Sequence, residues 1–232
     1  INKTVHYLTL LANQNNSNAQ YILGLIYHSA HYFPLDINKT IHYLTLSADQ
    51  GNPGAQYLLG VIYYTAEGVP RNINKSIRYL SSSADQGNSE AQYALGSIYF
   101  VAEYVQKNMN KSIHYLTLSS NQNNSEAQFR LGLIYYTAKN AFRDINKSIH
   151  YLKLSANQNH SYAQYFLGLF YYFADYVPRD MNKTIHYLTL SAKQNNSDAQ
   201  LLLGFIYYYG EYIPRDINKS IHYLKLSANQ NH

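Results

Sequence analysis

The residues with the clearest chemical potential are asparagines in the pattern Asn-x-Ser/Thr, the acceptor sequence for N-linked glycans. Seven of them recur at intervals of 36 residues, and four more lie in polar turns. Duplication of a single chance sequon would give the same spacing, so an unmodified polar face is the alternative. The candidate glycosylation sites are Asn2, Asn38, Asn74, Asn110, Asn146, Asn182 and Asn218 in the regular series, with Asn15, Asn123, Asn159 and Asn195 in the turns.

A column of histidines recurs four residues after the regular asparagines, with Arg78 standing in its place once. A metal site needs several ligands within a few ångströms of one another. Packed helices lie about 8–10 Å apart, so one histidine per repeat cannot chelate an ion. We therefore expect a solvated face, with no metal and no cofactor, at His6, His42, His114, His150, His186 and His222.

Tyrosine is unusually frequent, with 27 residues in the chain. Two columns are expected in the core: Tyr7, Tyr43, Tyr79, Tyr115, Tyr151, Tyr187 and Tyr223, and Tyr27, Tyr63, Tyr99, Tyr135, Tyr171 and Tyr207. The others either belong to a helix buried nearly all round or line a concave face that binds a protein, a peptide or a sugar. The candidate partner-binding residues are Tyr21, Tyr57, Tyr93, Tyr165, Tyr64, Tyr136, Tyr172 and Tyr208, with Tyr32, Tyr104, Tyr176 and Tyr212 in loops.

No set of residues indicates catalysis. The chain has no cysteine, which excludes disulfides, cysteine–zinc sites, iron–sulfur clusters and a thiol nucleophile. A catalytic site should appear as residues that break the repeat, yet the breaks form no nucleophile–base pair, carboxylate pair or phosphate loop. They are Gly51–Gly54, Arg78, Ser81–Ser83, Arg130 and Lys139–Phe142. We predict that the protein is not an enzyme.

Charge and hydropathy exclude two further classes of partner. The net charge is +5, but seven of the eighteen Lys and Arg residues form one evenly spaced column rather than a patch. The repeat columns are also too uniform to read bases one by one, which argues against nucleic acid. No apolar run approaches the length of a membrane-spanning helix.

The elements that carry these residues follow one period. The pattern Ile/Met-Asn-Lys-Ser/Thr starts at residues 1, 37, 73, 109, 145, 181 and 217, and Ala-Gln-x-x-Leu-Gly-x-x-Tyr also recurs every 36 residues. Each period predicts two helices, or about thirteen in all. Helix A runs from about Ala19 to Ala30 with Ser17 as its N-cap, and helix B starts near Asp36 with Ile41, Leu44 and Ala48 buried.

A pair of short helices cannot bury both faces alone, so stacked neighbours should form an all-α solenoid over residues 1–232. A glycine recurs inside each A helix, where it costs about 1 kcal/mol relative to alanine. We expect another helix to pass too close there for a Cβ. The chain is expected to be a single continuous array and a fragment of a longer one.

The combination of Ala-x-x-x-Leu-Gly-x-x-Tyr, Asp-x-x-Lys-Ser/Thr-x-x-Tyr and a Ser-Ala pair before a Gly/Asn turn resembles the Sel-1-like repeat, a relative of the tetratricopeptide repeat. The resemblance covers the whole chain and implies a right-handed superhelix that acts as a scaffold for protein complexes. The Gly-x-Gly usual between the helices is missing here. Some bacterial members carry a disulfide per repeat and were linked to β-lactam binding, an activity that this cysteine-free chain gives no reason to expect.

Two functions follow from these observations. The first is a structural or assembly role, as a segment of a long glycosylated extracellular fibre whose repeats stack end to end with other copies. The alternative is a protein-interaction scaffold that binds a partner on a Tyr-rich concave face. The breaks fall in turns and in both helices, and this scatter favours the structural role. Used sequons would place the protein outside the cell, and unused ones in the cytoplasm.

Overall fold

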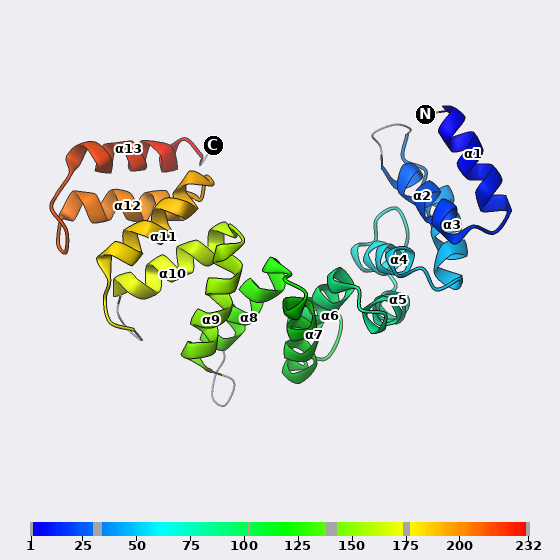
Figure 1. The fold of residues 1–232 in the computed structure, drawn as a ribbon, viewed down its shortest axis with the longest axis horizontal. Coiled ribbons are helices and arrows are strands. Elements are labelled where there is room, and N and C mark those ends of the chain that lie inside the picture. Colours follow the sequence, from blue (N-terminus) through cyan, green and yellow to red (C-terminus); the bar gives the residue numbers. More distant parts are fainter. Residues whose placement is uncertain (1, 30–33, 102, 138–142, 174–176, 231–232) are drawn as a thin grey trace. The chain divides into compact units, whose positions relative to one another are not determined.

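The computed structural model describes residues 2–29, 34–101, 103–137, 143–173 and 177–230. Within these ranges it contains thirteen α-helices and no strand, which confirms the predicted all-α solenoid (Figure 1). The predictions for Tyr32, Tyr176 and Lys139–Phe142 lie outside them. The helices are α1 (Asn2–Asn13), α2 (Ser17–His28), α3 (Ile37–Asp49), α4 (Pro53–Thr65), α5 (Ile73–Asp85), α6 (Ser89–Val101), α7 (Met109–Asn121), α8 (Ser125–Thr137), α9 (Ile145–Asn157), α10 (Ser161–Phe173), α11 (Met181–Lys193), α12 (Ser197–Tyr209) and α13 (Ile217–Ala228).

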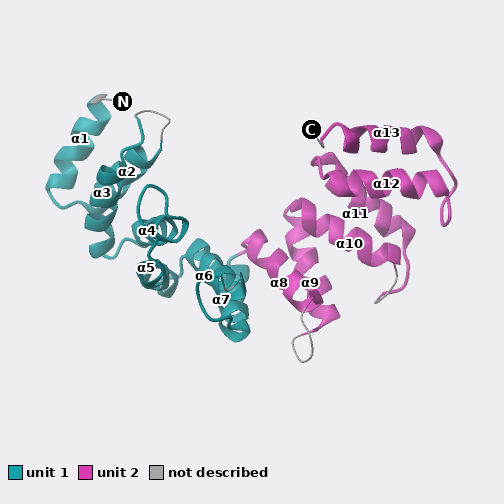
Figure 2. Cartoon of the chain, turned by 180° about the vertical axis from the view of Figure 1, so that it is seen from behind, with its two compact units in different colours: residues 1–122 teal, residues 123–232 magenta. Residues whose placement is uncertain are grey.

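The helices form two compact units, residues 1–122 and residues 123–232 (Figure 2). The even-numbered helices are the predicted A helices, and the odd-numbered ones are the predicted B helices. Each even helix packs against the odd helix that follows it within the same unit. Helix α2 begins at Ser17, two residues before the predicted start.

Short polar side chains start the odd-numbered helices, as predicted. The carboxylate of Asp180 accepts a hydrogen bond from the backbone N–H of Lys183, and Asp36, Asp144 and Asp216 cap their helices in the same way. Asn72 and Asn108 replace aspartate at α5 and α7. Asparagine and aspartate are therefore interchangeable caps at this point of the repeat.

The prediction that Ser17 caps the even helix is wrong. Asn15 adopts a left-handed conformation with φ 62°, and the extended residue Asn16 then presents its side chain to the N–H of Ala19 at 2.9 Å. Asn16 is thus the cap and Ser17 is already the first helical residue. The Ser17 hydroxyl lies 3.1 Å from that of Ser47 in the next helix.

The aspartate caps predict a pH dependence of stability. Hydrogen bonds from the Lys183 side chain and backbone lower the pKa of Asp180, and the Lys39 and Lys219 N–H groups lower the pKa of Asp36 and Asp216. A lowered folded-state pKa adds stability above the unfolded value of about 3.9, and this stability is lost as the pH falls through the folded-state pKa. We expect the melting temperature to fall between about pH 5 and pH 2.5.

The matched control replaces Asp36, Asp180 and Asp216 together by asparagine, which caps α5 and α7 in the native chain. Its melting temperature should fall less over the same interval, because the asparagine caps do not titrate. Parallel curves for the two proteins would contradict a role for these carboxylates.

The core lies where an odd helix crosses the even helix before it. Leu44 is fully buried together with Thr40, Ser47 and Ala48, whereas the predicted core residue Ile41 is only half-buried. A Cβ on Gly24 would lie 2.6 Å from the Leu44 side chain. The same glycine–leucine contact recurs at each equivalent glycine, which confirms the predicted close approach.

Each even helix is also joined by polar side chains to the odd helices beside it. The Ser155 hydroxyl donates to the carbonyl oxygen of Ser125 at 2.8 Å, and the Gln194 amide donates to the Gln164 side chain at 2.7 Å. Gln164 is fully buried and in turn donates to the carbonyl oxygen of Ala156 at 3.2 Å. Burial of the Gln164 amide is tolerated because the amide has its hydrogen-bond partners.

The two tyrosine columns meet as stacked pairs rather than as a closed core. Tyr171 and Tyr187 lie 6.1 Å apart between ring centroids and are nearly parallel, and Lys183 lies 5.0 Å above Tyr171. Five further pairs have the same geometry. Tyr7, on α1, is the exception and is 64% exposed. The core prediction is wrong for Tyr7.

Candidate functional site

Among the helical positions, differences between the six repeats gather on one face of the even helices. Counted from the first residue of each even helix, the second, sixth, ninth and thirteenth positions each carry at least four residue types. This spacing places them on a single side of a helix. We call them the variable stripe: Asn18, Ile22, Leu25, Ser29, Gly54, Leu58, Val61, Thr65, Glu90, Ala94, Ser97 and Val101 in the first unit, and Glu126, Arg130, Leu133, Thr137, Tyr162, Phe166, Leu169, Phe173, Asp198, Leu202, Phe205 and Tyr209 in the second.

Every residue of the variable stripe is exposed or half-buried. The positions between them are Ala, Gln, Leu and Gly at the third, fourth, seventh and eighth residues of all six even helices, and these are buried. The core positions therefore need the same residue in every repeat, whereas the stripe positions do not. The residues that break the repeat most strongly are scattered over turns and helices, as the sequence indicated. The smaller substitutions between repeats instead cluster on the variable stripe.

The candidate partner-binding tyrosines flank the stripe at the fifth and twelfth positions. Tyr57 and Tyr64 pack against the hydrophobic cluster around Leu95, and Tyr165 and Tyr172 pack against that around Leu203. Tyr21 and Tyr136 make the equivalent contact, and these six, like Tyr93, are half-buried; Tyr208 is 45% exposed. These six rings thus pack against the next repeat, and the role of the eight tyrosines in partner binding stays a prediction.

Partial burial affects the chemistry of these phenols. Burial raises the pKa of Tyr57, Tyr64 and Tyr165, and nearby carboxylates (Glu90, Glu103 and Asp198, respectively) raise it further. The phenols are therefore neutral hydrogen-bonding groups at physiological pH, suited to contact rather than to acid–base chemistry.

Sequence reasoning missed two arginines that tie adjacent loops together. The Nε of Arg71 donates to the carbonyl oxygen of Tyr64, and its guanidinium lies 4.4 Å from the ring centroid of Tyr104 in the next loop. Arg179 makes the same contacts with Tyr172 and, at 3.8 Å, with Tyr212. The sequence does contain a signal for this contact, because the arginines recur at one position of the repeat and the loop tyrosines recur at another.

The structure places the sequon asparagines at two kinds of site. Asn38, Asn74, Asn110, Asn146, Asn182 and Asn218 are exposed in the first turns of odd helices; the side chain of Asn2 lies outside the described residues. Asn15, Asn123, Asn159 and Asn195 are exposed in turns and left-handed. The hydroxyl-bearing residues of the first group, such as Thr40 and Ser76, are fully buried.

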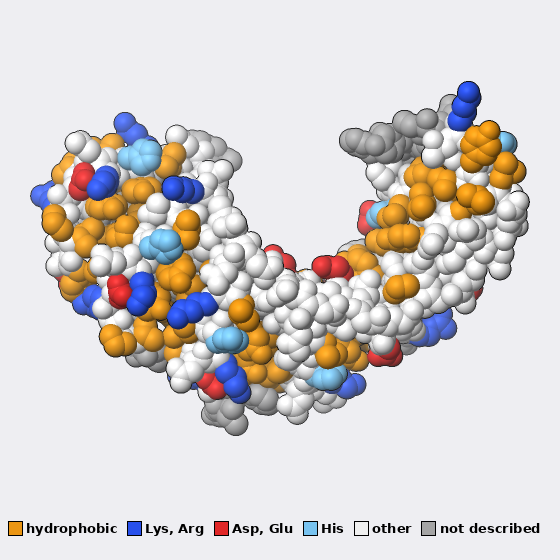
Figure 3. All heavy atoms as spheres, in the orientation of Figure 1, with side chains coloured by type: hydrophobic (Ala, Val, Ile, Leu, Met, Phe, Trp, Pro, Cys, Tyr) orange, Lys and Arg blue, Asp and Glu red, His pale blue; other side chains and the backbone are white. Residues whose placement is uncertain are grey.

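The histidine column is exposed from His6 to His222, as predicted. On the face in Figure 3, histidine and basic side chains are dispersed among uncharged ones. No group of three or more potential metal ligands occurs within the described ranges. None of the described helices has the length and hydropathy that a bilayer crossing demands.

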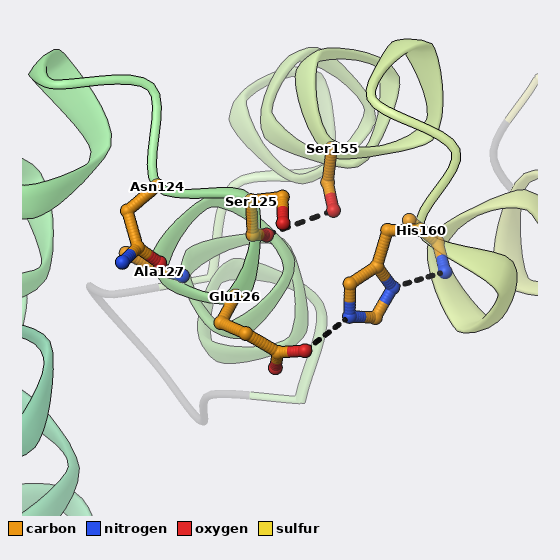
Figure 4. A network of polar contacts seen from close by, with 7 residues as sticks. Asn124, Ser125, Glu126, Ala127, Ser155 and His160 are labelled. Carbon is orange, nitrogen blue, oxygen red and sulfur yellow. Dashed lines mark hydrogen bonds and ion pairs between the residues drawn. The ribbon is translucent and has the colours of Figure 1, made fainter. Parts of the chain in front are cut away.

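His160 is the most distinctive histidine of the chain. It occupies the cap position that asparagine holds at α2, α4 and α12, and its Nδ1 accepts from the N–H of Ala163 at 3.2 Å (Figure 4). Its Nε2 lies 3.0 Å from a carboxylate oxygen of Glu126, and its ring stacks on Phe129 at 4.5 Å. Acceptance at Nδ1 places the proton of the neutral ring on Nε2, which then donates to Glu126.

This geometry predicts the effect of replacing His160. We expect His160→Ala to cost about 0.5–2 kcal/mol of unfolding free energy, because the N–H of Ala163 loses its acceptor. His160→Asn should cost less, since asparagine performs this role in other repeats. Urea unfolding of the three proteins gives the comparison, and an equal loss in both variants would show that the ring contacts, not the cap, matter.

The repeat geometry agrees with what this chain is similar to. The Sel1 repeat model matches residues 17–52, 53–88, 89–124, 125–160, 161–196 and 197–232, nearly the whole chain. The chain belongs to the Sel1 repeat family. Sel1 repeat solenoids generally serve as non-catalytic scaffolds for protein–protein interaction.

Solved Sel1 structures match closely. A protective antigen present in uropathogenic Escherichia coli strains, which displays an SLR fold, matches with a TM-score of 0.91 at 27% identity over 97% of this chain. This Sel1 chain spans only 48% of that antigen's length. A Sel1 repeat protein from Oxalobacter formigenes matches at 25% identity with a TM-score of 0.80, over 92% of this chain and 86% of that one.

More distant structures share the fold alone. An immunity protein from Pseudomonas aeruginosa matches with a TM-score of 0.53 at 17% identity, over 92% of this chain and 81% of that one. No curated protein sequence matches this Sel1 repeat chain.

Proposed function

We propose that this chain is a protein-binding scaffold whose partner contacts the variable stripe. The observation that carries the proposal is the contrast between the two helix sets. Odd helices keep Asn-Lys and Tyr-Leu in every copy, whereas the stripe positions of the even helices differ from copy to copy and remain accessible. A surface that recognises one partner along its length needs a different side chain at each step, whereas a solvated face does not.

The most exposed aromatic side chains of the variable stripe lie in the second unit. Tyr162 and Phe173 on α10 are 52% and 53% exposed, and Tyr209 on α12 is 70% exposed. Exposed aromatic side chains that contribute little to the core favour a role in binding, where rigid rings give contact area at low entropic cost.

The test compares two triple variants. Partners are captured from cells that produce the protein and identified by mass spectrometry. Tyr162→Ser, Phe173→Ser and Tyr209→Ser together should abolish specific capture, while His114→Ser, His150→Ser and His186→Ser on the exposed odd-helix face should leave it unchanged. Loss with the histidine variant alone would place binding on the other face and refute the proposal.

The glycosylated extracellular fibre stays a separate prediction. The face that it would use is that of the odd helices, whose uniform exposed asparagines suit a regular coat better than a specific contact. Electron microscopy of natural material distinguishes the two, since long fibres with a repeat-sized rise would support an assembly role and discrete particles would not.

Glycan attachment is expected to precede folding if it occurs. The acceptor pattern includes the hydroxyl residue two places after asparagine, and in α3, α5, α7, α9, α11 and α13 that residue is buried once the chain is folded. We expect secreted protein to lose mass on treatment with a glycan-removing enzyme, whereas folded, unmodified protein added to the modifying enzyme should gain no mass at the sequons of these six helices. Secreted protein at the bare polypeptide mass would contradict the prediction.

A further inference from the structure

A pocket of about 250 Å³ opens on the variable stripe between α4 and α6 of the first unit. Its walls are apolar, with Val61 from α4 and Ala94 and Val101 from α6. Its floor is formed by Leu80 of α5 and Ile98 of α6. A Cβ on Gly60 would lie 2.6 Å from Leu80, so the floor is fixed by the tight glycine–leucine contact of the core.

The pocket coincides with two small stripe residues in the same helix. Ala94 is the sixth residue of α6, where the other even helices carry Ile, Leu, Arg, Phe or Leu. Ser97 is the ninth, where the others carry Leu, Val, Leu, Leu or Phe. The third repeat thus lacks the side chains that would fill this space.

One polar group in the pocket has no partner. The Ser97 hydroxyl oxygen is inaccessible to solvent and makes no hydrogen bond within the described residues. Such an unsatisfied group is unfavourable, and buried polar groups in proteins are nearly always paired. Because Ser97 lines the pocket, a change of its side-chain rotamer would turn the hydroxyl toward the pocket, where a ligand atom that donates to it or accepts from it removes that penalty.

The charges around the pocket differ at its two ends. Glu90 is exposed one helical turn before Ala94 on the same stripe. At the other end, the cations already lie against rings: Arg71 on Tyr104, and Lys107 on Phe100 at 5.3 Å. The end of the pocket next to Glu90 therefore favours a positively charged ligand group.

We propose that this pocket binds one aromatic side chain with a polar edge, tryptophan or tyrosine, from a basic segment of a partner protein. The inference rests on the proposed scaffold function and specifies its partner. A cavity of about 150 Å³ holds benzene, so this pocket has room for an indole or a phenol. The indole N–H or phenol hydroxyl pairs with Ser97, and a neighbouring Lys or Arg of the partner pairs with Glu90. Tryptophan, tyrosine and arginine are also the residues that dominate binding energy at interfaces.

The test selects random peptides on the full chain by display and measures the affinity of those enriched. We expect them to share Trp or Tyr within a few residues of Lys or Arg. In the variant Ala94→Leu with Ser97→Leu, which places leucines native to other repeats into the pocket, affinity should fall at least about tenfold. Thr137→Leu, which adds a leucine on an exposed stripe position of the second unit, should leave it unchanged.

Two finer variants test the chemistry. Ser97→Ala should weaken binding of the selected peptide but not of its Trp→Phe analogue, which lacks the polar edge. Glu90→Gln should weaken binding and reduce its dependence on salt.

The pocket assignment is overturned if no peptide is enriched or if the enriched peptides bind the filled variant equally well. If those peptides lose affinity when Tyr162, Phe173 and Tyr209 are replaced by serine, the scaffold function stands and only the pocket is wrong. Enriched peptides whose affinity does not change when the pocket is filled or when any other stripe residue is replaced would refute both the pocket assignment and the scaffold function.

Discussion

Leu152→Ala should lower the free energy of unfolding by about 2–5 kcal/mol, the largest effect expected for a single substitution here. Leu152 is fully buried between α8 and α9, where its side chain packs against Gly132. Truncation removes apolar contacts and leaves a cavity that the surrounding helices can close only in part. Urea unfolding monitored by circular dichroism measures the change.

The matched control is Leu226→Ala, the same substitution at a 36% exposed position of another odd helix. Its cost should be below about 1 kcal/mol, because little area is buried there. Equal losses at the two positions would contradict the location of the core at the helix crossing.

Gly132→Val should cost about 1–3 kcal/mol by overpacking the same crossing. A Cβ at this position would lie 2.7 Å from Leu152 Cγ and 3.3 Å from the Ser148 carbonyl oxygen. Intrinsic helix preference favours valine over glycine, so a loss of stability can come only from the close approach. Thermal melting gives the direction, and a neutral or stabilising result would refute the steric explanation.

Two comparisons isolate the steric term. Gly54→Ala should be near neutral, because the new Cβ would meet only the movable ring tip of Tyr21, and other repeats carry side chains at this position. Gly132→Ala should also cost less in a Leu152→Ala background than in the native chain, since the clashing Leu152 atoms are gone.

Much of this architecture could be predicted from the sequence because each local signal agreed with the period. The aspartate caps, the glycine in mid-helix and the apolar spacing all pointed to paired helices. The cap of the even helix was mispredicted because Asn16 and Ser17 are both good capping residues and adjacent. Only the left-handed turn at Asn15 decides between them, and that depends on where the preceding helix ends.

The binding surface was harder to predict for a different reason. Many of the stripe substitutions, such as Ile22, Ala94 and Phe166 at the sixth position, exchange one apolar residue for another and do not disturb the repeat pattern. Their significance appears only once the neighbouring positions are known to be buried. The pocket further requires two small residues of α6 to face α4 above Leu80, a packing relation that spacing alone does not contain.

The serine and glutamine bonds between paired helices have a consequence for how such a chain can change in length. Each joins a residue of an even helix to one thirty positions later, as in Ser17 to Ser47 and Gln20 to Gln50, so both partners lie within one matched repeat. Excision of residues 53–88 would bring Asn52 next to Ser89 and leave these bonds intact, and Gln92, which donates to the Ala84 carbonyl oxygen as Gln56 does to that of Ala48, would take the place of Gln56. Whole repeats can therefore be lost or gained without redesign of the interior, while each event alters the order of side chains that a partner meets.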